Sequence, residues 1–238
     1  MTHTPIWLRP ERGARGPRPA RSRADIAAAA IALADAEGIE AVSLRGVAGA
    51  LGTGTTTLYR YIASKDELFE LMIDGVMGEQ EPPVPTGDWQ ADLRAVAAAH
   101  RAMALRHPWL AMLPTTRPAF GPNSLMWLEA TFATVQPLDL DPDEALIQVS
   151  AVLTFVRGHV GDELAEREAA RRSGMDTAAW MTAQRRYGDM IFNSGRYPYL
   201  SRIMIEAGTP HADDRFERAF QRGLDLILIG VAHSSVTD

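Results

Sequence analysis

The side chains best suited to specific chemistry lie close together between residues 45 and 65. They are hydroxyls, phenols and cations: Arg45, Thr55, Thr56, Thr57, Tyr59, Arg60, Tyr61 and Lys65. Such groups make poor core material, but they can reach base edges and phosphates in the major groove of DNA. The pattern therefore favours a DNA-recognition helix at about 55–62. The competing interpretation is an ordinary three-helix cluster with Tyr59 packed inside.

Capping residues place the helices that must position this set. Ser22 and Asp25 form a capping-box pattern that opens a first helix, and Ser64 with Glu67 opens a fourth helix in the same way. The second and third helices are joined by the Gly-containing turn at 52–54, which makes a helix-turn-helix.

Charge is distributed unevenly along the 238 residues. Residues 1–65 carry nine basic and five acidic side chains, whereas the remainder carries 15 basic and 25 acidic ones. A basic end on an acidic body confines the positive potential to one region, so a net charge of −6 is compatible with DNA binding. Residues 1–21, rich in Arg, Pro and Gly, predict a flexible basic arm that contacts DNA; the alternative is a merely disordered tail.

Composition and motifs exclude several classes of protein. The absence of Cys excludes disulfides and thiolate metal sites, and no apolar run is long enough to span a membrane. The first residues lack a signal-peptide core, so we expect a cytoplasmic protein. The nucleophile-elbow and zinc-protease motifs are missing, and we expect no enzyme. His100 and His107 have no evident acidic or third His partner, so we expect neither a metal nor a cofactor.

The chain beyond residue 80 predicts a second, larger helical domain. A Pro-rich break at 81–87 marks the boundary, and Asp141-Pro142 is a strong start for a long helix that continues past Leu164. The expected fold is all-α. The expected domains are the arm at 1–21, a helix-turn-helix DNA-binding domain at 22–80, and a helical regulatory and dimerisation domain at 88–238.

Aromatic and Met side chains in this second domain predict a small-molecule pocket, because such pockets combine apolar walls with a few polar groups. The candidates are His100, Met103, Trp109, Met112, Phe120, Met126, Trp127, Phe155 and His159. The competing interpretation is an ordinary core, in which a lone His on an apolar helix face is a structural group.

A longer pattern carries a resemblance to a known family. Residues 51–61 read Leu-Gly-x-x-x-x-Thr-Leu-Tyr-x-Tyr, and residues 64–68 read Ser-Lys-Asp-Glu-Leu. Together with Ala36-Glu37-Gly38 and Ser43-Leu44-Arg45, this pattern resembles the signature of the TetR family of bacterial repressors. The resemblance implies that the eight residues from Arg45 to Lys65 named above contact operator DNA. Gly54 departs from the Ser that often caps the family's third helix, a change that costs little capping energy.

The C-terminal half resembles the tetracycline-repressor type of regulatory domain. The resemblance rests on His107-Pro108-Trp109-Leu110, on Thr116-Arg117-Pro118, and on the apolar run from Phe220 to Leu228. Val96 and Leu113 stand where that resemblance implies two polar contacts to magnesium-bound tetracycline. We therefore expect an apolar or aromatic ligand in place of that chelate.

The last helix, at Asp213–Ala232, is expected to form a dimer interface. Its apolar stripe consists of Phe216, Phe220, Leu224, Ile227, Leu228 and Val231. With the Asp141–Leu164 helix it could form a four-helix contact between two copies, as the family resemblance implies. The alternative is a helix buried inside one subunit.

These observations predict a homodimeric transcriptional regulator, most simply a repressor that a small apolar or aromatic effector releases from a palindromic operator. Two alternatives stay open. The first is a regulator of the same fold with no small-molecule ligand. The second is a helical ligand-binding protein or enzyme with a vestigial DNA-recognition unit.

Overall fold

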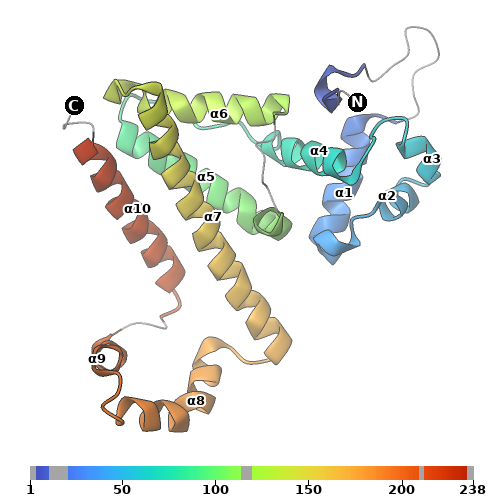
Figure 1. Cartoon of the computed structure of the whole chain (residues 1–238). Helices are drawn as coiled ribbons and strands as arrows, with labels where there is room; N and C mark the ends of the chain where they lie inside the picture. Colours follow the sequence, from blue (N-terminus) through green and yellow to red (C-terminus); the bar gives the residue numbers. More distant parts are fainter. Residues whose placement is uncertain (1–3, 11–20, 114–119, 209–211, 235–238) are drawn as a thin grey trace.

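The computed structural model in Figure 1 describes residues 4–10, 21–113, 120–208 and 212–234. Every regular element within these ranges is helical, which confirms the all-α prediction. The elements are η1 Ile6–Leu8, α1 Arg23–Glu37, η2 Ile39–Ala41, α2 Leu44–Ala50, α3 Thr55–Leu58, α4 Lys65–Met77, α5 Trp89–Arg106, η3 Pro108–Met112, α6 Pro122–Val135, η4 Gln136–Leu138, α7 Pro142–Ser173, α8 Thr177–Phe192, α9 Pro198–Glu206 and α10 Arg215–Ser234.

Side-chain caps explain where several of these helices begin. At α1 the Ser22 hydroxyl accepts the Asp25 N–H at 3.1 Å, and the Ser22 N–H donates to the Asp25 carboxylate at 2.7 Å. This backbone hydrogen bond from Ser22 lowers the pKa of Asp25. At α7 the Asp141 carboxylate accepts two backbone N–H groups of the first turn, and Pro142 takes the first helical position. Both helix starts were predicted correctly because capping acts over three residues.

Two local predictions differ from the structure. α3 ends at Leu58 instead of Ile62, although backbone hydrogen bonds of helical type continue to Ile62. The Ser64 hydroxyl accepts the Glu67 N–H at 3.2 Å, but the Glu67 carboxylate bonds the N–H of Ala63, so the predicted second capping box is only half formed.

Helices α1 to α4 form the N-terminal domain, in which α1 packs against α4 and α2 adjoins α3 (Figure 1). The core of this domain also includes Ile6 of η1, which is completely buried. The prediction of a flexible arm over 1–21 is therefore wrong for residues 4–10, because an apolar side chain anchors them. Residues 1–3 and 11–20 of that arm lie outside the described residues.

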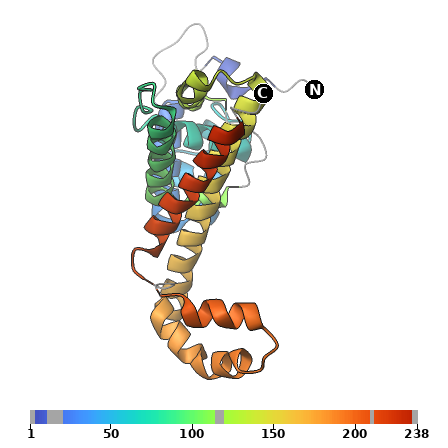
Figure 2. The same ribbon diagram turned by 90° about the vertical axis from the view of Figure 1, so that its left-hand side faces the viewer.

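The C-terminal domain is built around α5, α7 and α10. α10 lies along α7 (Figures 1 and 2), and both bury apolar side chains in a core shared with α5. Arg101 on α5 connects the three helices, since its guanidinium donates to Glu163 of α7 at 3.0 Å and also binds Glu217 of α10. Hydrogen bonds from Gln221 and Arg101 lower the pKa of Glu217.

The apolar stripe predicted for dimerisation packs inside the subunit. Phe220, Leu224 and Leu228 are buried in the core shared with α7, and Val231 is also buried. This side of α10 packs against α7 of the same chain, because α7 is long enough to lie along most of α10. A different face of α10 is exposed, and it carries Leu226.

Helices α8 and α9 project from the body of the molecule and bury no residue in the single chain (Figures 1 and 2). Their exposed side chains include Trp180, Tyr199 and Ile203. No helix in the described ranges has the length and apolar character needed to cross a membrane.

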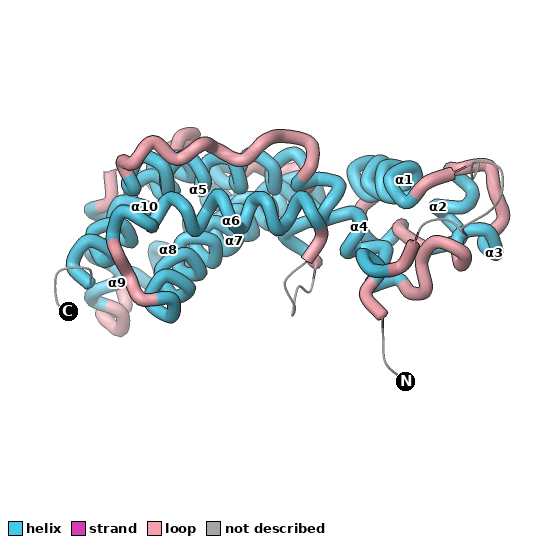
Figure 3. The backbone as a smooth tube through the Cα atoms, turned by 90° about the horizontal axis from the view of Figure 1, so that it is seen from above, coloured by secondary structure: helices cyan, strands magenta, loops and turns pink. Residues whose placement is uncertain are grey.

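The two domains lie end to end (Figure 3), but their packing is continuous. The apolar core of α1 to α4 also contains Met103, Trp109, Leu113 and Trp127, which all come from beyond the predicted boundary at 81–87. Residues 81–87 form a loop, and the apolar core continues across the boundary between the two domains.

Candidate nucleic-acid interface and ligand pocket

Helices α2 and α3 form the predicted helix-turn-helix at one end of the molecule (Figures 1 and 3). Between them Gly52 has φ 64°, in the left-handed region that favours glycine. Leu58 and Ile62, one helical turn apart, are each 1% exposed and anchor α3 and its extension on the core. Because these anchors define the inner face, Tyr59 and Arg60 between them are directed outward.

The structure leaves most of the predicted DNA contacts accessible. Arg45, Thr56, Tyr59, Arg60 and Lys65 are exposed, whereas Thr55, Thr57 and Tyr61 are half-buried. Tyr59 is 60% exposed, which contradicts the interpretation that it packs inside; Tyr61 packs against the core instead. None of the three cations forms an ion pair with a described carboxylate, and the Lys65 ammonium lies 5.1 Å from the centre of the Phe69 ring. Their contact with DNA stays a prediction.

A polar network that the sequence did not predict holds this unit together. The Arg9 guanidinium binds Glu67, whose carboxylate also accepts the Ala63 N–H at 2.6 Å. Arg23 donates to the carbonyls of Ile6 and Arg9, each at 2.9 Å. The partners of the Arg9 and Arg23 side chains in this network are 14 to 58 residues away in the chain, so no local pattern pointed to them.

Arg21 links the start of α1 to the helix-turn-helix. Its guanidinium donates to the carbonyl of Leu51 at the end of α2, at 2.8 Å. The chain that precedes α1 is therefore held beside the turn that leads into α3. A basic side chain is thus present at the edge of the predicted DNA-binding surface.

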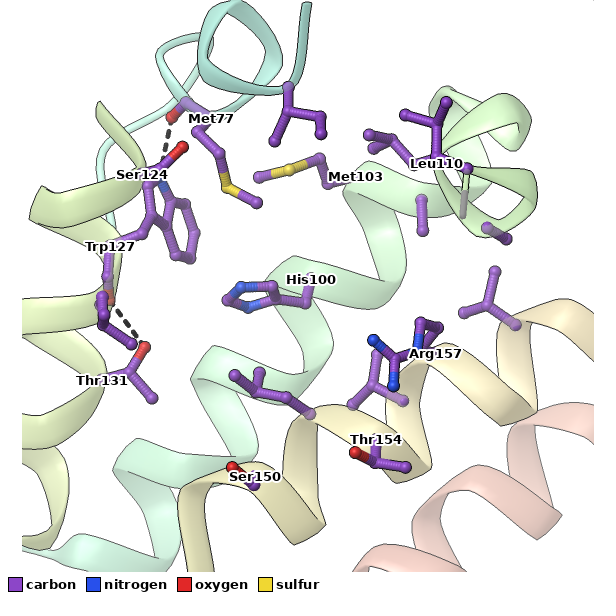
Figure 4. A pocket seen from close by; sticks show the side chains of 18 residues that line it. Met77, His100, Met103, Leu110, Ser124, Trp127, Thr131, Ser150, Thr154 and Arg157 are labelled. Atoms are coloured by element: carbon purple, nitrogen blue, oxygen red, sulfur yellow. Dashed lines mark hydrogen bonds between the residues drawn. The ribbon is translucent and has the colours of Figure 1, made fainter. Parts of the chain in front are cut away.

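A pocket of about 530 Å³ lies between α5, α6 and α7 and is closed at one end by η3 and α4 (Figure 4). This volume is in the range of small-molecule sites. The pocket is lined by Ile73, Met77, His100, Met103, Ala104, Leu110, Ala111, Leu113, Ser124, Trp127, Leu128, Thr131, Ser150, Leu153, Thr154, Val156, Arg157 and Val160. Its composition is mainly apolar, as the sequence predicted.

The pocket contains three of the nine residues predicted to line it, namely His100, Met103 and Trp127. The other six residues do not line this pocket. Met112, Phe120 and Met126 are exposed, whereas Trp109 is buried outside the pocket. Phe155 and His159 pack against Phe220 on the α10 side of α7. Residue type indicated side chains suited to an apolar pocket. The rotation of each helix about its axis decides which of them line the pocket.

Sequence reasoning missed the polar side chains of α7. Ser150, Thr154 and Arg157 line the pocket and are spaced four and three residues apart, so they share one helix face. This spacing is visible in the sequence, and it could have predicted that the three polar side chains share one surface. Leu113 lines the pocket, whereas Val96 is completely buried outside it, so neither supplies a polar contact of the kind expected for a magnesium–tetracycline complex.

His100 is held neutral by its surroundings. Burial lowers its pKa, and the hydrogen bond from its ring to the Val96 carbonyl, at 3.0 Å, opposes this effect only in part. Since a carbonyl can only accept, Nδ1 carries the proton and Nε2 is left as an acceptor. The ring meets Trp127 edge-on with centroids 4.9 Å apart (Figure 4). This pair offers an aromatic surface with one polar atom.

Hydrogen bonds from three residues of α6 join the pocket wall to α4 of the N-terminal domain. The Asp74 carboxylate accepts the N–H of Ser124 at 2.9 Å, and Asn123 donates to the Asp74 carbonyl at 3.0 Å. The indole N–H of Trp127 donates to the carbonyl of Met77 at 2.8 Å (Figure 4). Ser124 and Trp127 both line the pocket, so a displacement of α6 by a ligand acts directly on α4.

A second connection runs from η3 to α1. His107 is 4% exposed, and its ring nitrogens lie 2.9 Å from Asp35 and 3.0 Å from Glu79. The indole N–H of Trp109 donates to the same Asp35 carboxylate at 2.7 Å. Because the following residue, Leu110, lines the pocket, η3 contacts the pocket and α1 at once. No cluster of three or more potential metal ligands occurs among the described residues.

Comparison with known proteins agrees with this arrangement. The family described as "Bacterial regulatory proteins, tetR family" matches residues 26–72, and "Tetracyclin repressor-like, C-terminal domain" matches residues 81–234. The chain is 36% identical over 229 residues to the HTH-type transcriptional repressor DrrR1 of Streptomyces coeruleorubidus, covering 95% of this chain and 84% of that protein.

Solved structures of ActR from Streptomyces coelicolor are also similar. Apo ActR is 28% identical with a TM-score of 0.70, and ActR in complex with actinorhodin is 26% identical with a TM-score of 0.75. Each match covers 90% of this chain and 97% of ActR.

A helix-turn-helix domain joined to a helical domain with a small-molecule pocket defines a ligand-responsive DNA-binding regulator. The chain belongs to the TetR family of transcriptional regulators, as both of its domains show. Thr116-Arg117-Pro118, part of the sequence resemblance, lies outside the described residues.

Proposed function

We propose that this protein is a homodimeric repressor that leaves its operator when a small aromatic molecule occupies the pocket. The observation that carries this proposal is the dual role of Ser124 and Trp127. Both line the pocket, and both hydrogen-bond to α4, the last helix of the DNA-binding domain. A ligand that moves α6 therefore changes the position of the DNA-binding domain.

In this proposal α3 enters the major groove and α2 crosses the phosphate backbone. Thr55, Thr56, Tyr59 and Arg60 supply base or phosphate contacts, and Thr57 and Tyr61 complete the surface. Arg45 and Lys65 bind phosphates on either side. The support is the exposure of five of these eight side chains and the absence of ion pairs to described carboxylates that would compete with DNA.

The proposed dimer uses the exposed sides of α7 and α10. Ile147 on α7 is 62% exposed and Leu226 on α10 is 58% exposed, so each helix carries an apolar side chain away from the intrachain core. Small residues accompany them, and a β-carbon at Gly158 or Gly230 would meet nothing within 4 Å in the single chain. Two copies of this face would form an isologous four-helix contact that spaces two recognition helices.

The proposed switch is a population shift. The ligand binds better to a form of the dimer in which the two recognition helices are wrongly spaced, and the differential affinity releases DNA. Repression is supported by the name of the relative DrrR1, and ligand response by ActR, which is solved with actinorhodin. The pocket itself favours this function over a same-fold regulator without a ligand, whose pocket would be filled by side chains.

The test begins with the purified protein and the DNA upstream of its own gene. We expect footprinting at stated salt, with competitor DNA, to show a protected palindrome. A panel of aromatic compounds should then shorten or remove the protection. If unbiased binding-site selection also yields no bound sequence, the DNA-binding step is wrong. If the operator is found but no compound weakens binding, the ligand-free regulator is preferred.

A further inference from the structure

The pocket between α5, α6 and α7 carries charge of one sign. Arg157 is the one charged group among the described side chains that line it, and none of them is Asp or Glu. His100 adds no charge near neutral pH, since burial lowers its pKa. A ligand in this pocket therefore meets a positive potential with no compensating carboxylate on the walls.

Most of the buried side chains that line the pocket are apolar, whereas the exposed ones on α7 are polar. Met103, Trp127 and Val160 are at most 2% exposed and supply buried apolar walls. Thr154 and Arg157 on α7 are exposed and stand at the mouth. Figure 4 shows the Arg157 guanidinium directed from α7 into the pocket, on the side of His100. A complementary ligand is thus apolar at one end and anionic at the other.

Arg157 differs from Arg101 and Arg167, two other arginines of the C-terminal domain. Arg101 and Arg167 both bind Glu163, whereas Arg157 forms no ion pair with any carboxylate in the described ranges. A guanidinium presents a planar fork of donors that matches a carboxylate in a bidentate geometry. Its donors are therefore available for a ligand.

A second polar group lacks a partner at the opposite wall. The Ser124 hydroxyl is buried, lines the pocket and makes no hydrogen bond within the described part of the chain. A buried hydroxyl without a partner is costly, and a polar substituent on a ligand would relieve that cost. The pocket thus offers polar contacts at two ends of an otherwise apolar space.

We infer that the effector is an amphipathic aromatic acid whose ring system lies against Trp127 and Met103 and whose carboxylate or ionised phenol is bound by Arg157. Thr154 donates a further hydrogen bond to the same acid group. The inference rests on the proposed function, because it names the chemical class of ligand for the same pocket. It excludes cationic ligands, which would approach a like charge with no acidic side chain to offset it.

Two probes that share one ring system test the inference. 1-Pyrenebutyrate and 1-pyrenebutanol differ in the acid group, and both are followed by fluorescence titration of the full-length protein. We expect the acid to bind about tenfold more tightly than the alcohol, the effect of one charge-assisted hydrogen-bond pair. Arg157→Gln should abolish this preference by weakening the acid alone, and Arg157→Lys should keep part of it.

Arg172→Gln is the matched control, since Arg172 lies on the same helix with a 74% exposed side chain and outside the pocket. It should leave both affinities unchanged. Equal affinity of the unmodified protein for the two probes would overturn the inference and leave the proposed ligand step intact. If neither probe binds, or if Arg157→Gln weakens both equally, Arg157 does not select an acid. Failure of both probes would also count against the pocket as an effector site.

Discussion

The Asp74 carboxylate occupies the space that a β-carbon on Gly121 would fill. Asp74 belongs to α4, and Gly121 immediately precedes α6. Since Gly121 has no side chain to cap α6, the carboxylate of Asp74 accepts the Ser124 N–H and acts as the cap from another domain. A side chain of the DNA-binding domain therefore caps the N-terminus of α6, the helix that forms one wall of the pocket.

Gly121→Ala should reduce the free energy of unfolding by about 1–3 kcal/mol, because the new methyl group displaces Asp74 from the end of α6. Urea unfolding followed by circular dichroism measures the change. Gly49→Ala is the control, since a β-carbon there meets nothing within 4 Å and should be neutral or stabilising. Equal stability of Gly121→Ala and the unmodified protein would show that the cap is dispensable.

Tyr59 and Tyr61 should respond differently to substitution although they are two residues apart. Tyr59→Ala should weaken operator binding about tenfold with unchanged melting temperature, because this side chain is 60% exposed. Tyr61→Ala should lower the free energy of unfolding by about 2 kcal/mol, because Tyr61 packs against the core. Gel-shift and thermal-melt experiments on both variants decide the assignment. The reverse pattern would contradict the orientation of α3.

Lys65→Ala should weaken binding to all DNA sequences to a similar extent. An ammonium at the start of α4 suits a phosphate, so its loss should reduce the slope of log K against log salt by about one unit. The measurement is a set of binding titrations at several salt concentrations with operator and random DNA. A variant that retains the full salt dependence would remove Lys65 from the phosphate contacts.

His100 should make stability depend on pH. Burial lowers its folded-state pKa below the ordinary value of 6.5, so the unfolded chain takes up the proton first as pH falls. The stability associated with neutral His100 is fully present above pH 6.5 and is lost below it, down to the folded-state pKa. His100→Gln should therefore show a smaller loss of unfolding free energy between about pH 7 and pH 5. Parallel pH profiles would contradict this expectation.

Charge placed on the exposed side of α7 and α10 should separate the subunits. Ile147→Glu combined with Leu226→Glu should convert the proposed dimer into a single chain of 26.0 kDa, because two apolar contacts become repulsive. Light scattering after size-exclusion chromatography gives the mass. Val84→Glu is the control, at an 83% exposed position in the loop between domains. If the unmodified protein already has the mass of one chain, the dimer proposal is wrong.

The sequence predicted correctly those features that depend on interactions between residues close together in the chain. Ser22 with Asp25 predicted the start of α1, and Asp141-Pro142 predicted the start of α7, because caps act between residues two or three apart. The helix-turn-helix was equally visible, since its turn and anchors lie within a dozen residues. The all-α class and the family followed from these local patterns.

Other features depended on partners far apart in the chain. Asp74 and Ser124 are 50 residues apart, and Asp35 and His107 are 72 apart, so no spacing rule connects them. The rotation of each helix about its axis also lies beyond local pattern: it turned Phe155 toward α10 and Arg157 toward the pocket. The sequence by itself determined the helices and the DNA-recognition motif, because propensity and capping are local. Tertiary structure alone decided the pocket lining and the contacts between domains, because packing selects which face of each helix is buried.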